Sequence, residues 1–203
     1  MESERRLVVR LMKNSLFAFE VCMRLVPGMP LRQGLQQLVF SHPEHAGHQD
    51  RYALYSQITD LLGHNLNLAE RGCWEYFDDH DRAISDYDMW SKGMITEEGA
   101  RTAPSGAPDP YRPEPRYMTF TIAMLFVQGS PTDRLMSEVC DIPESVLWNR
   151  NTFGRILTGL RGISFASVQS DILYLIPGDE AWGLTLEDMA LPKFDYLRPI
   201  VNA

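Results

Sequence analysis

The stretch RYMTFTIAMLFVQG, residues 116–129, decides the fold class. Thr, Ile, Phe and Val dominate it, prolines precede it and Gly129 ends it. β-Branched and aromatic residues fit a pleated strand, and a run this apolar is typical of a strand that becomes buried on both faces. We therefore predict a strand here, and with it a β-sheet in the second half of the chain.

The residues that follow this strand predict helices and one further strand. SPTDRLMSEVC (130–140) places a Ser or Thr cap and a proline at the start of a short helix. TFGRILTGLRGI (152–163) has helical spacing, ASVQSDILYLIPGDE (166–180) reads as a strand ended by Pro177, and TLEDMALPKF (185–194) begins a short helix that stops at Pro192. The second half is thus predicted to be a small β-sheet covered by helices.

Upstream of residue 116 the composition changes abruptly. TEEGARTAPSGAPDPYRPEP (96–115) holds five prolines, which is typical of an extended linker. We predict a helical lobe at 1–95, a Pro-rich linker at 96–115 and a small α+β lobe at 116–203. The fold class expected for the whole chain is α+β, with a helical N-terminal lobe.

Apolar spacing carries the prediction of that helical lobe. Residues 4–26 show a wide apolar stripe, which suggests a helix buried on more than one side. PGMP (27–30) ends it, LRQGLQQLVF (31–40) fits a second helix, and a third is expected from Gln49 to about Cys73.

Composition and charge exclude several classes of protein. The 203 residues carry a formal net charge of −8 without a basic cluster, so nucleic acid is not an expected partner. Cys22, Cys73 and Cys140 are widely spaced, which indicates free thiols in a reducing compartment. The chain shows neither a secretory leader nor an apolar run of about 20 residues, so we expect a soluble, cytoplasmic protein without direct membrane insertion.

Three histidines in SHPEHAGHQDRY (41–52) raise the question of a metal site. His42, His45 and His48 could supply three imidazoles to a zinc ion that keeps an open position for water. Pro43 and Gly47 argue against a regular helix that would bring the rings together, which favours a solvated loop between two helices.

A second candidate lies in WEYFDDHDRAISDYDMW (74–90). Asp78, His80 and Asp81, within an acidic cluster at 78–88, could bind a divalent cation or act as acid and base. An acidic, solvated helix face explains the same residues more simply. The chain has no nucleophile elbow, phosphate-binding glycine loop or dinucleotide fingerprint, and we predict no cofactor.

The C-terminal half resembles a known family. RYMTFTIAMLFV, FGRILTGLRGI and SDILYLIPGDEAWGLTLEDMALPKFDYLRPI, together covering about residues 116–200, are similar to the family called domain of unknown function 1517, found in cyanobacteria and plastids. Tyr117 leads the first strand, as in that family, whereas Leu175 and Ile176 stand where the family has Trp and Thr. The resemblance implies an accessory or regulatory protein and supplies no catalytic residues.

These observations favour a non-enzymatic protein–protein interaction module, such as an adaptor, assembly or regulatory factor. Trp182, Phe194 and Tyr196 are the candidate partner-binding residues, because they are amphipathic anchors near a terminus; packing of all three on the sheet is the simpler interpretation. A protein partner is expected, and a homo-oligomer is a further hypothesis. The alternative is a metal-dependent hydrolase that uses the histidine segment and the acidic cluster.

Overall fold

A single antiparallel sheet organises the molecule. The structure, a computed structural model, describes residues 13–41, 46–95, 114–178 and 182–202. The strand order is β4-β3-β1-β2-β5, and each neighbouring pair is antiparallel. The strands are β1 (Asn14–Leu25), β2 (Ala69–Phe77), β3 (Arg116–Val127), β4 (Val168–Ile176) and β5 (Arg198–Pro199).

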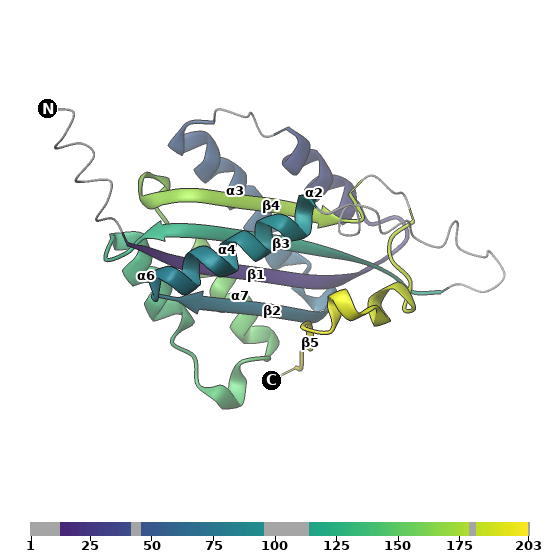
Figure 1. The fold of residues 1–203 in the computed structure, drawn as a ribbon. Helices are drawn as coiled ribbons and strands as arrows, with labels where there is room; N and C mark the ends of the chain where they lie inside the picture. The colour runs from purple at the N-terminus through teal and green to yellow at the C-terminus, as the bar shows by residue number, and fades with distance from the viewer. Residues whose placement is uncertain (1–12, 42–45, 96–113, 179–181, 203) are drawn as a thin grey trace, which may run out of the picture.

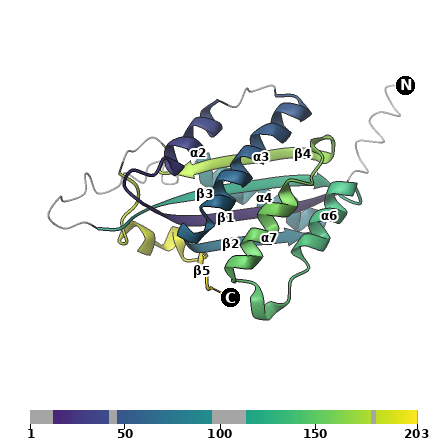
Figure 2. The same cartoon turned by 180° about the vertical axis from the view of Figure 1, so that it is seen from behind.

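Helices cover both faces of the sheet and give a three-layer arrangement. On one face lie α2 (Leu31–Phe40), α3 (His48–His64), α6 (Pro131–Cys140) and α7 (Arg150–Leu160); Figure 2 shows this side. On the other face lie α4 (His80–Ile95) and a C-terminal segment that we define as residues 182–197 (Figure 1). Short 3-10 turns occur at Leu66–Leu68, Glu144–Val146, Phe165–Ser167, Asp188–Ala190 and Pro192–Phe194.

Strand alternation divides the core between the two faces. Phe17, Phe19 and Met23 of β1 belong to the large cluster under α3 and α7, whereas Leu16 and Cys22 belong to smaller clusters under α4 and the C-terminal segment. Burial of one such large apolar side chain contributes about 1.5–3 kcal/mol. The central strand therefore carries stabilising side chains on both of its faces.

The predicted helical N-terminal lobe is wrong. Residues 14–25, placed in a helix from their wide apolar stripe, form β1, and the first ten of them are buried. A strand buried on both faces is apolar at nearly every position, so periodicity does not separate it from a buried helix. The α+β composition stands, but the chain begins its described fold with the central strand of the sheet.

The later elements agree better with the sequence. The strands expected within 116–129 and 166–180 and the helices expected at 31–40, 130–140 and 152–163 are confirmed, with ends shifted by up to a few residues. The short helix expected at 185–194 is wrong, because this stretch forms two 3-10 turns. The third helix ends at His64 instead of continuing to Cys73, because Ala69–Phe77 pairs with β1 as β2. Residues 96–113 of the predicted linker lie outside the described residues.

The sheet joins the two halves of the chain. β1 pairs with β2 on one side and with β3 on the other, so strands from before and after the Pro-rich stretch alternate in one sheet. The large core cluster likewise draws side chains from both halves. Within the described residues, no helix has the length and apolar character needed to cross a membrane.

Candidate functional site

A carboxyl group lies buried in the middle of the sheet, on the face covered by α4 and the C-terminal segment. Glu20 is in β1 between Ala18 and Cys22, and its relative exposure is 0%. Across the strands it pairs with Thr121 of β3 and Cys73 of β2. A central position of this face is thus occupied by a carboxyl group.

The C-terminal segment supplies the hydrogen bond to this carboxyl group. The Tyr196 hydroxyl donates to Glu20 Oε2 at 2.8 Å, across 176 positions of sequence. The other oxygen, Oε1, is buried without a hydrogen bond of ordinary geometry, and the buried hydroxyls of Thr119 and Thr121 lie close to the carboxyl group. Burial raises the pKa of Glu20, while the hydroxyls of Tyr196, Thr121 and Thr119 lower it in part.

The groups around Glu20 are held in their neutral forms. We call Glu20, Cys73, Thr119, Thr121, Tyr174 and Tyr196 the Glu20 cluster. Burial, and after it the carboxylates of Glu75 and Glu20, raises the pKa of the Cys73 thiol to about 12. Burial and Glu20 also raise the pKa values of Tyr174 and Tyr196. A thiol or phenol must lose its proton to act as a nucleophile, and these groups keep theirs at neutral pH. We therefore interpret the Glu20 cluster as a structural feature that holds the C-terminal segment on the sheet.

Helix α4 lies on the same face of the sheet and contacts Tyr196 and Glu75 through Trp90. The Trp90 indole N–H donates to Glu75 Oε1 at 2.6 Å, and its ring meets the Tyr196 ring edge-on with the centroids 6.0 Å apart. Burial raises the pKa of Glu75, and the hydrogen bond from Trp90 lowers it in part. Trp90 therefore links β2, α4 and the C-terminal segment around Tyr196.

The C-terminal segment is fixed on the sheet by its own apolar side chains and backbone. The Tyr117 and Leu184 backbones exchange two hydrogen bonds, at 2.8 and 2.7 Å, which attach the segment to β3. The Thr185 hydroxyl accepts from the Asp188 N–H, and Asp188 Oδ2 accepts from the Thr185 N–H, which closes the following turn. A core cluster beneath the segment contains Cys22, Tyr117, Leu184, Met189, Phe194 and Leu197.

Gly183 allows this attachment. Its φ of +74° lies in the left-handed region, and a Cβ added there would stand 2.8 Å from the Tyr117 carbonyl oxygen and 2.5 Å from Leu25 Cδ1. A side chain at this position would therefore push the segment away from β3.

The three predicted partner-binding residues occupy different environments. Phe194 is 2% exposed and packs in the core beneath the segment, whereas Trp182 and Tyr196 are 44% and 41% exposed. Tyr196 has two roles, because its ring contributes to the surface while its hydroxyl binds buried Glu20. Phe194 packs between the segment and the sheet, so Trp182 and Tyr196 are the two predicted aromatic residues that a partner could contact.

The predicted metal ligands are not assembled by the described residues. His42 and His45 lie outside the described residues, and His48 begins α3 on one face of the sheet while His80 begins α4 on the other. His80 Nδ1 accepts a hydrogen bond from the Asn14 N–H at 3.0 Å, and Asp78 and Asp81 are exposed. In the part of the chain that the structure describes, no three His, Cys, Asp or Glu side chains are grouped to hold a metal ion.

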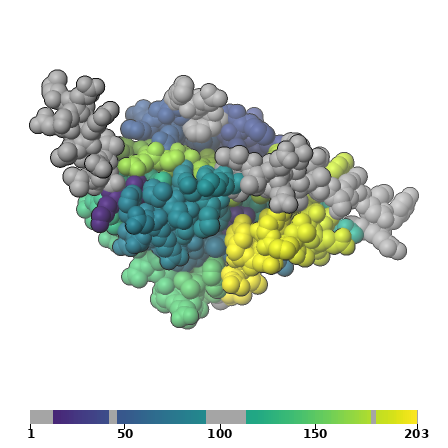
Figure 3. Space-filling view, in the orientation of Figure 1, coloured from purple at the N-terminus to yellow at the C-terminus, as the bar shows by residue number. Residues whose placement is uncertain are grey.

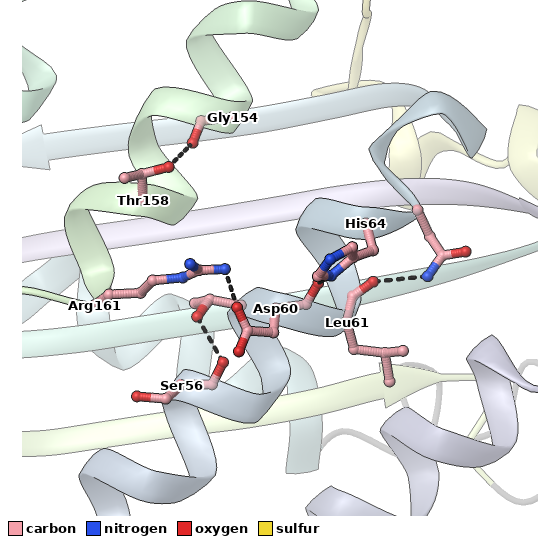
Figure 4. A network of polar contacts seen from close by, with 9 residues as sticks. Ser56, Asp60, Leu61, His64, Gly154, Thr158 and Arg161 are labelled. Atoms are coloured by element: carbon pink, nitrogen blue, oxygen red, sulfur yellow. Dashed lines mark hydrogen bonds and ion pairs between the residues drawn. The ribbon is translucent and has the colours of Figure 1, made fainter.

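The remaining described histidine, His64, belongs to a surface network between α3 and α7, shown in Figure 4. Its Nδ1 lies 2.7 Å from the Asp60 carbonyl oxygen, and the Asp60 carboxylate forms an ion pair with Arg161. Both charged side chains are about half exposed, so the pair contributes little, of the order of 0–1 kcal/mol. The network joins two helices and has no feature of a reactive site.

Sequence reasoning missed Glu20, although a signal was present. It is the only charged residue in LFAFEVCM (16–23), and a lone carboxylate in an apolar run that is buried on both faces must lie in the core. Assigning this run to a helix hid that conclusion, because one position of a helix can face the solvent.

Comparison with family models, with curated proteins and with solved structures found no match to this chain. The resemblance of residues 116–200 to the domain of unknown function 1517 family stays a prediction.

Proposed function

We propose that this chain is a non-enzymatic protein-binding module and that the C-terminal segment is its partner surface. One observation carries the proposal. Buried side chains of the segment pack against the sheet, yet the segment exposes four large apolar side chains to the solvent. Trp182, Leu186, Leu191 and Tyr196 are 44%, 56%, 42% and 41% exposed. Exposed apolar side chains gathered on one element are typical of a protein–protein contact.

The attachment of the segment favours binding. A partner that docks on a segment already fixed on a sheet does not have to order it, and ordering a flexible segment opposes association. The contacts of Leu184, Phe194 and Tyr196 with the sheet provide that order. Figure 3 shows the segment, in yellow, as a continuous surface beside α4, in blue-green.

The charge of this face indicates the chemistry of the partner. Arg82 pairs with Asp86 and Lys92 with Asp88, whereas Asp79 and Asp81 form no ion pair with a described residue. The C-terminal segment adds exposed Glu187 and Asp195. An acidic face around apolar side chains fits a partner that presents apolar residues bordered by Lys or Arg.

The chemistry of the Glu20 cluster supports a structural role beneath this surface. Burial raises the pKa of all three cysteines, Cys22, Cys73 and Cys140, to about 12, which leaves almost no thiolate at neutral pH. The buried carboxyl of Glu20 is bound by the residue that covers it, Tyr196. The cluster thus positions the surface.

The proposal is tested by quantitative affinity purification from the native host. A double variant, Leu186→Asp with Leu191→Asp, places two charges on the partner surface and is expected to reduce recovery of the specific partner at least tenfold, a loss of about 1.4 kcal/mol or more in binding. The wild-type interaction is also expected to weaken with added salt.

Phe40→Asp is the matched control. Phe40 is 70% exposed at the end of α2, on the opposite face of the sheet, so a charge there is expected to leave recovery unchanged. Retention of every specific partner by the double variant, with its fold intact by circular dichroism, would rule out the C-terminal segment as the partner surface.

A further inference from the structure

The outer edge of β4 has no strand partner among the described residues. β3 pairs with β4 from Thr119 to Phe126 on one side, and β4 is the first strand in the sheet order. Figures 1 and 2 both place it at the border of the sheet. Backbone N–H and C=O groups that point outward from an edge strand are free to pair with another extended strand.

The two edges of the sheet differ in how they are protected. The opposite edge, β5, has only two residues, one of which is Pro199 and lacks an N–H group. β4 has nine residues and contains no proline, lysine or arginine. Its only charged residue, Asp171, binds Arg51 and the Tyr55 hydroxyl of its own chain. β4 thus lacks the proline and the lysine that often keep an edge strand from pairing, and its protective features are limited to an irregularity in its pairing at Leu125/Phe126 and the inward-pointing Asp171.

The side chains of β4 favour an added strand. Residues 172–176 are ILYLI, and Ile172, Leu173 and Tyr174 are only partly buried, as members of a strand with a neighbour on one side. A second strand alongside would bury more of these apolar side chains and satisfy the outward backbone groups at the same time.

These features favour a second copy of this chain as the source of the strand that pairs with the outer edge of β4. The net charge of −8 makes two copies repel each other wherever charged faces meet. β4 avoids this repulsion, because its one carboxylate, Asp171, forms an ion pair with Arg51 of its own chain. A two-fold axis through the contact lets each copy cover the open edge of the other. Since the sheet formed by the described residues has one long open edge, the assembly closes at two copies and does not grow into a filament.

We propose that two copies of this chain pair antiparallel through β4 and so join their sheets into one. The inference is independent of the proposed function, because Ile172 lies in β4 and the partner surface lies on the C-terminal segment. Light scattering coupled to gel filtration, at low and at high micromolar concentration, measures the mass. Wild-type protein is expected to reach twice the mass of one chain, and Ile172→Lys is expected to shift the population to monomer at the same concentration.

Val201→Lys is the control, because Val201 is 49% exposed and lies beside the protected β5 edge; this variant is expected to remain a dimer. Hydrogen exchange of wild-type protein gives a second measurement that needs no variant. The β4 amides are expected to exchange more slowly at high than at low protein concentration. A monomeric wild type at high concentration, or a dimer whose β4 amides show no such dependence, would overturn the proposal.

Discussion

Gly183→Ala is expected to lower the free energy of unfolding by about 2–5 kcal/mol and to release the C-terminal segment from β3. About 1–2 kcal/mol comes from placing a Cβ at a φ of +74°, and overpacking against the Tyr117 carbonyl and Leu25 adds about 1–3 kcal/mol. Chemical denaturation measures the loss, and hydrogen exchange is expected to show faster exchange at Leu184 and Tyr117, whose backbones bond each other.

Gly129→Ala separates the two contributions. Gly129 has nearly the same φ, +75°, but a Cβ there meets nothing within 4 Å. Its substitution is expected to cost only the backbone strain of about 1–2 kcal/mol and to leave the exchange of the C-terminal segment unchanged. Equal losses in the two variants would show that the close packing of Gly183 against β3 does not hold the segment.

Glu20→Gln is expected to stabilise the protein at pH 8 relative to wild type and to have little effect near pH 4. The pKa of Glu20 is raised by burial, so the folded state keeps a proton that the unfolded state releases once the pH exceeds the ordinary glutamate value. This contribution is fully present below that value and is lost as pH rises through the folded-state pKa. Glutamine stays neutral, so the variant avoids the loss.

The measurement is the free energy of unfolding of wild type and variant across pH 4 to 8. The wild-type curve is expected to fall faster with rising pH, and the variant keeps a smaller slope in which Glu75, whose pKa burial also raises, takes part. Glu138→Gln, at an exposed position of α6, is expected to leave the wild-type slope unchanged. A Glu20→Gln variant that is less stable at pH 8 than at pH 4, relative to wild type, would show that Glu20 is ionised in the fold.

Tyr196→Phe tests the other half of this contact. It removes the hydroxyl that donates to Glu20 Oε2 and keeps the aromatic ring against Trp90. A loss of about 0.5–1.5 kcal/mol is expected, the usual contribution of one hydrogen bond. The loss is expected to grow as pH rises through the folded-state pKa of Glu20, because the Tyr196 hydroxyl stabilises the ionised carboxyl and so lowers that pKa. A denaturation series with both variants and their combination gives the coupling between the two residues.

Local sequence determined what could be predicted. The strand at 116–127 has prolines before it and a glycine after it, and both ends were therefore marked in the sequence. The strand at 14–25 lacks such marks at its start, and its apolar residues fit a buried helix equally well. Only pairing with β2 and β3, a non-local feature, decides that this run is extended.

The candidate site was harder to predict from the sequence than the strands were, because it is formed almost entirely by contacts between residues far apart in the chain. Glu20 meets Cys73, Thr121 and Tyr196, which are brought together by strand pairing and by the fold of the C-terminal segment. The sequence did place Trp182 and Tyr196 among the candidate partner residues, from their chemistry and their position near a terminus. The turns between residues 185 and 194 decide that Phe194 lies in the core while the other two aromatic side chains are exposed. The sequence alone does not predict these turns.

Site-specific photo-crosslinking shows whether a partner binds at the C-terminal segment. A photoreactive phenylalanine analogue replaces Leu186 in one protein and Tyr52 in another; both positions are exposed, and Tyr52 lies on α3, across the sheet. We expect one specific covalent adduct from position 186, which the Leu191→Asp change reduces, and no such adduct from position 52. The same adduct from position 52, or none from position 186, would contradict the proposed partner surface.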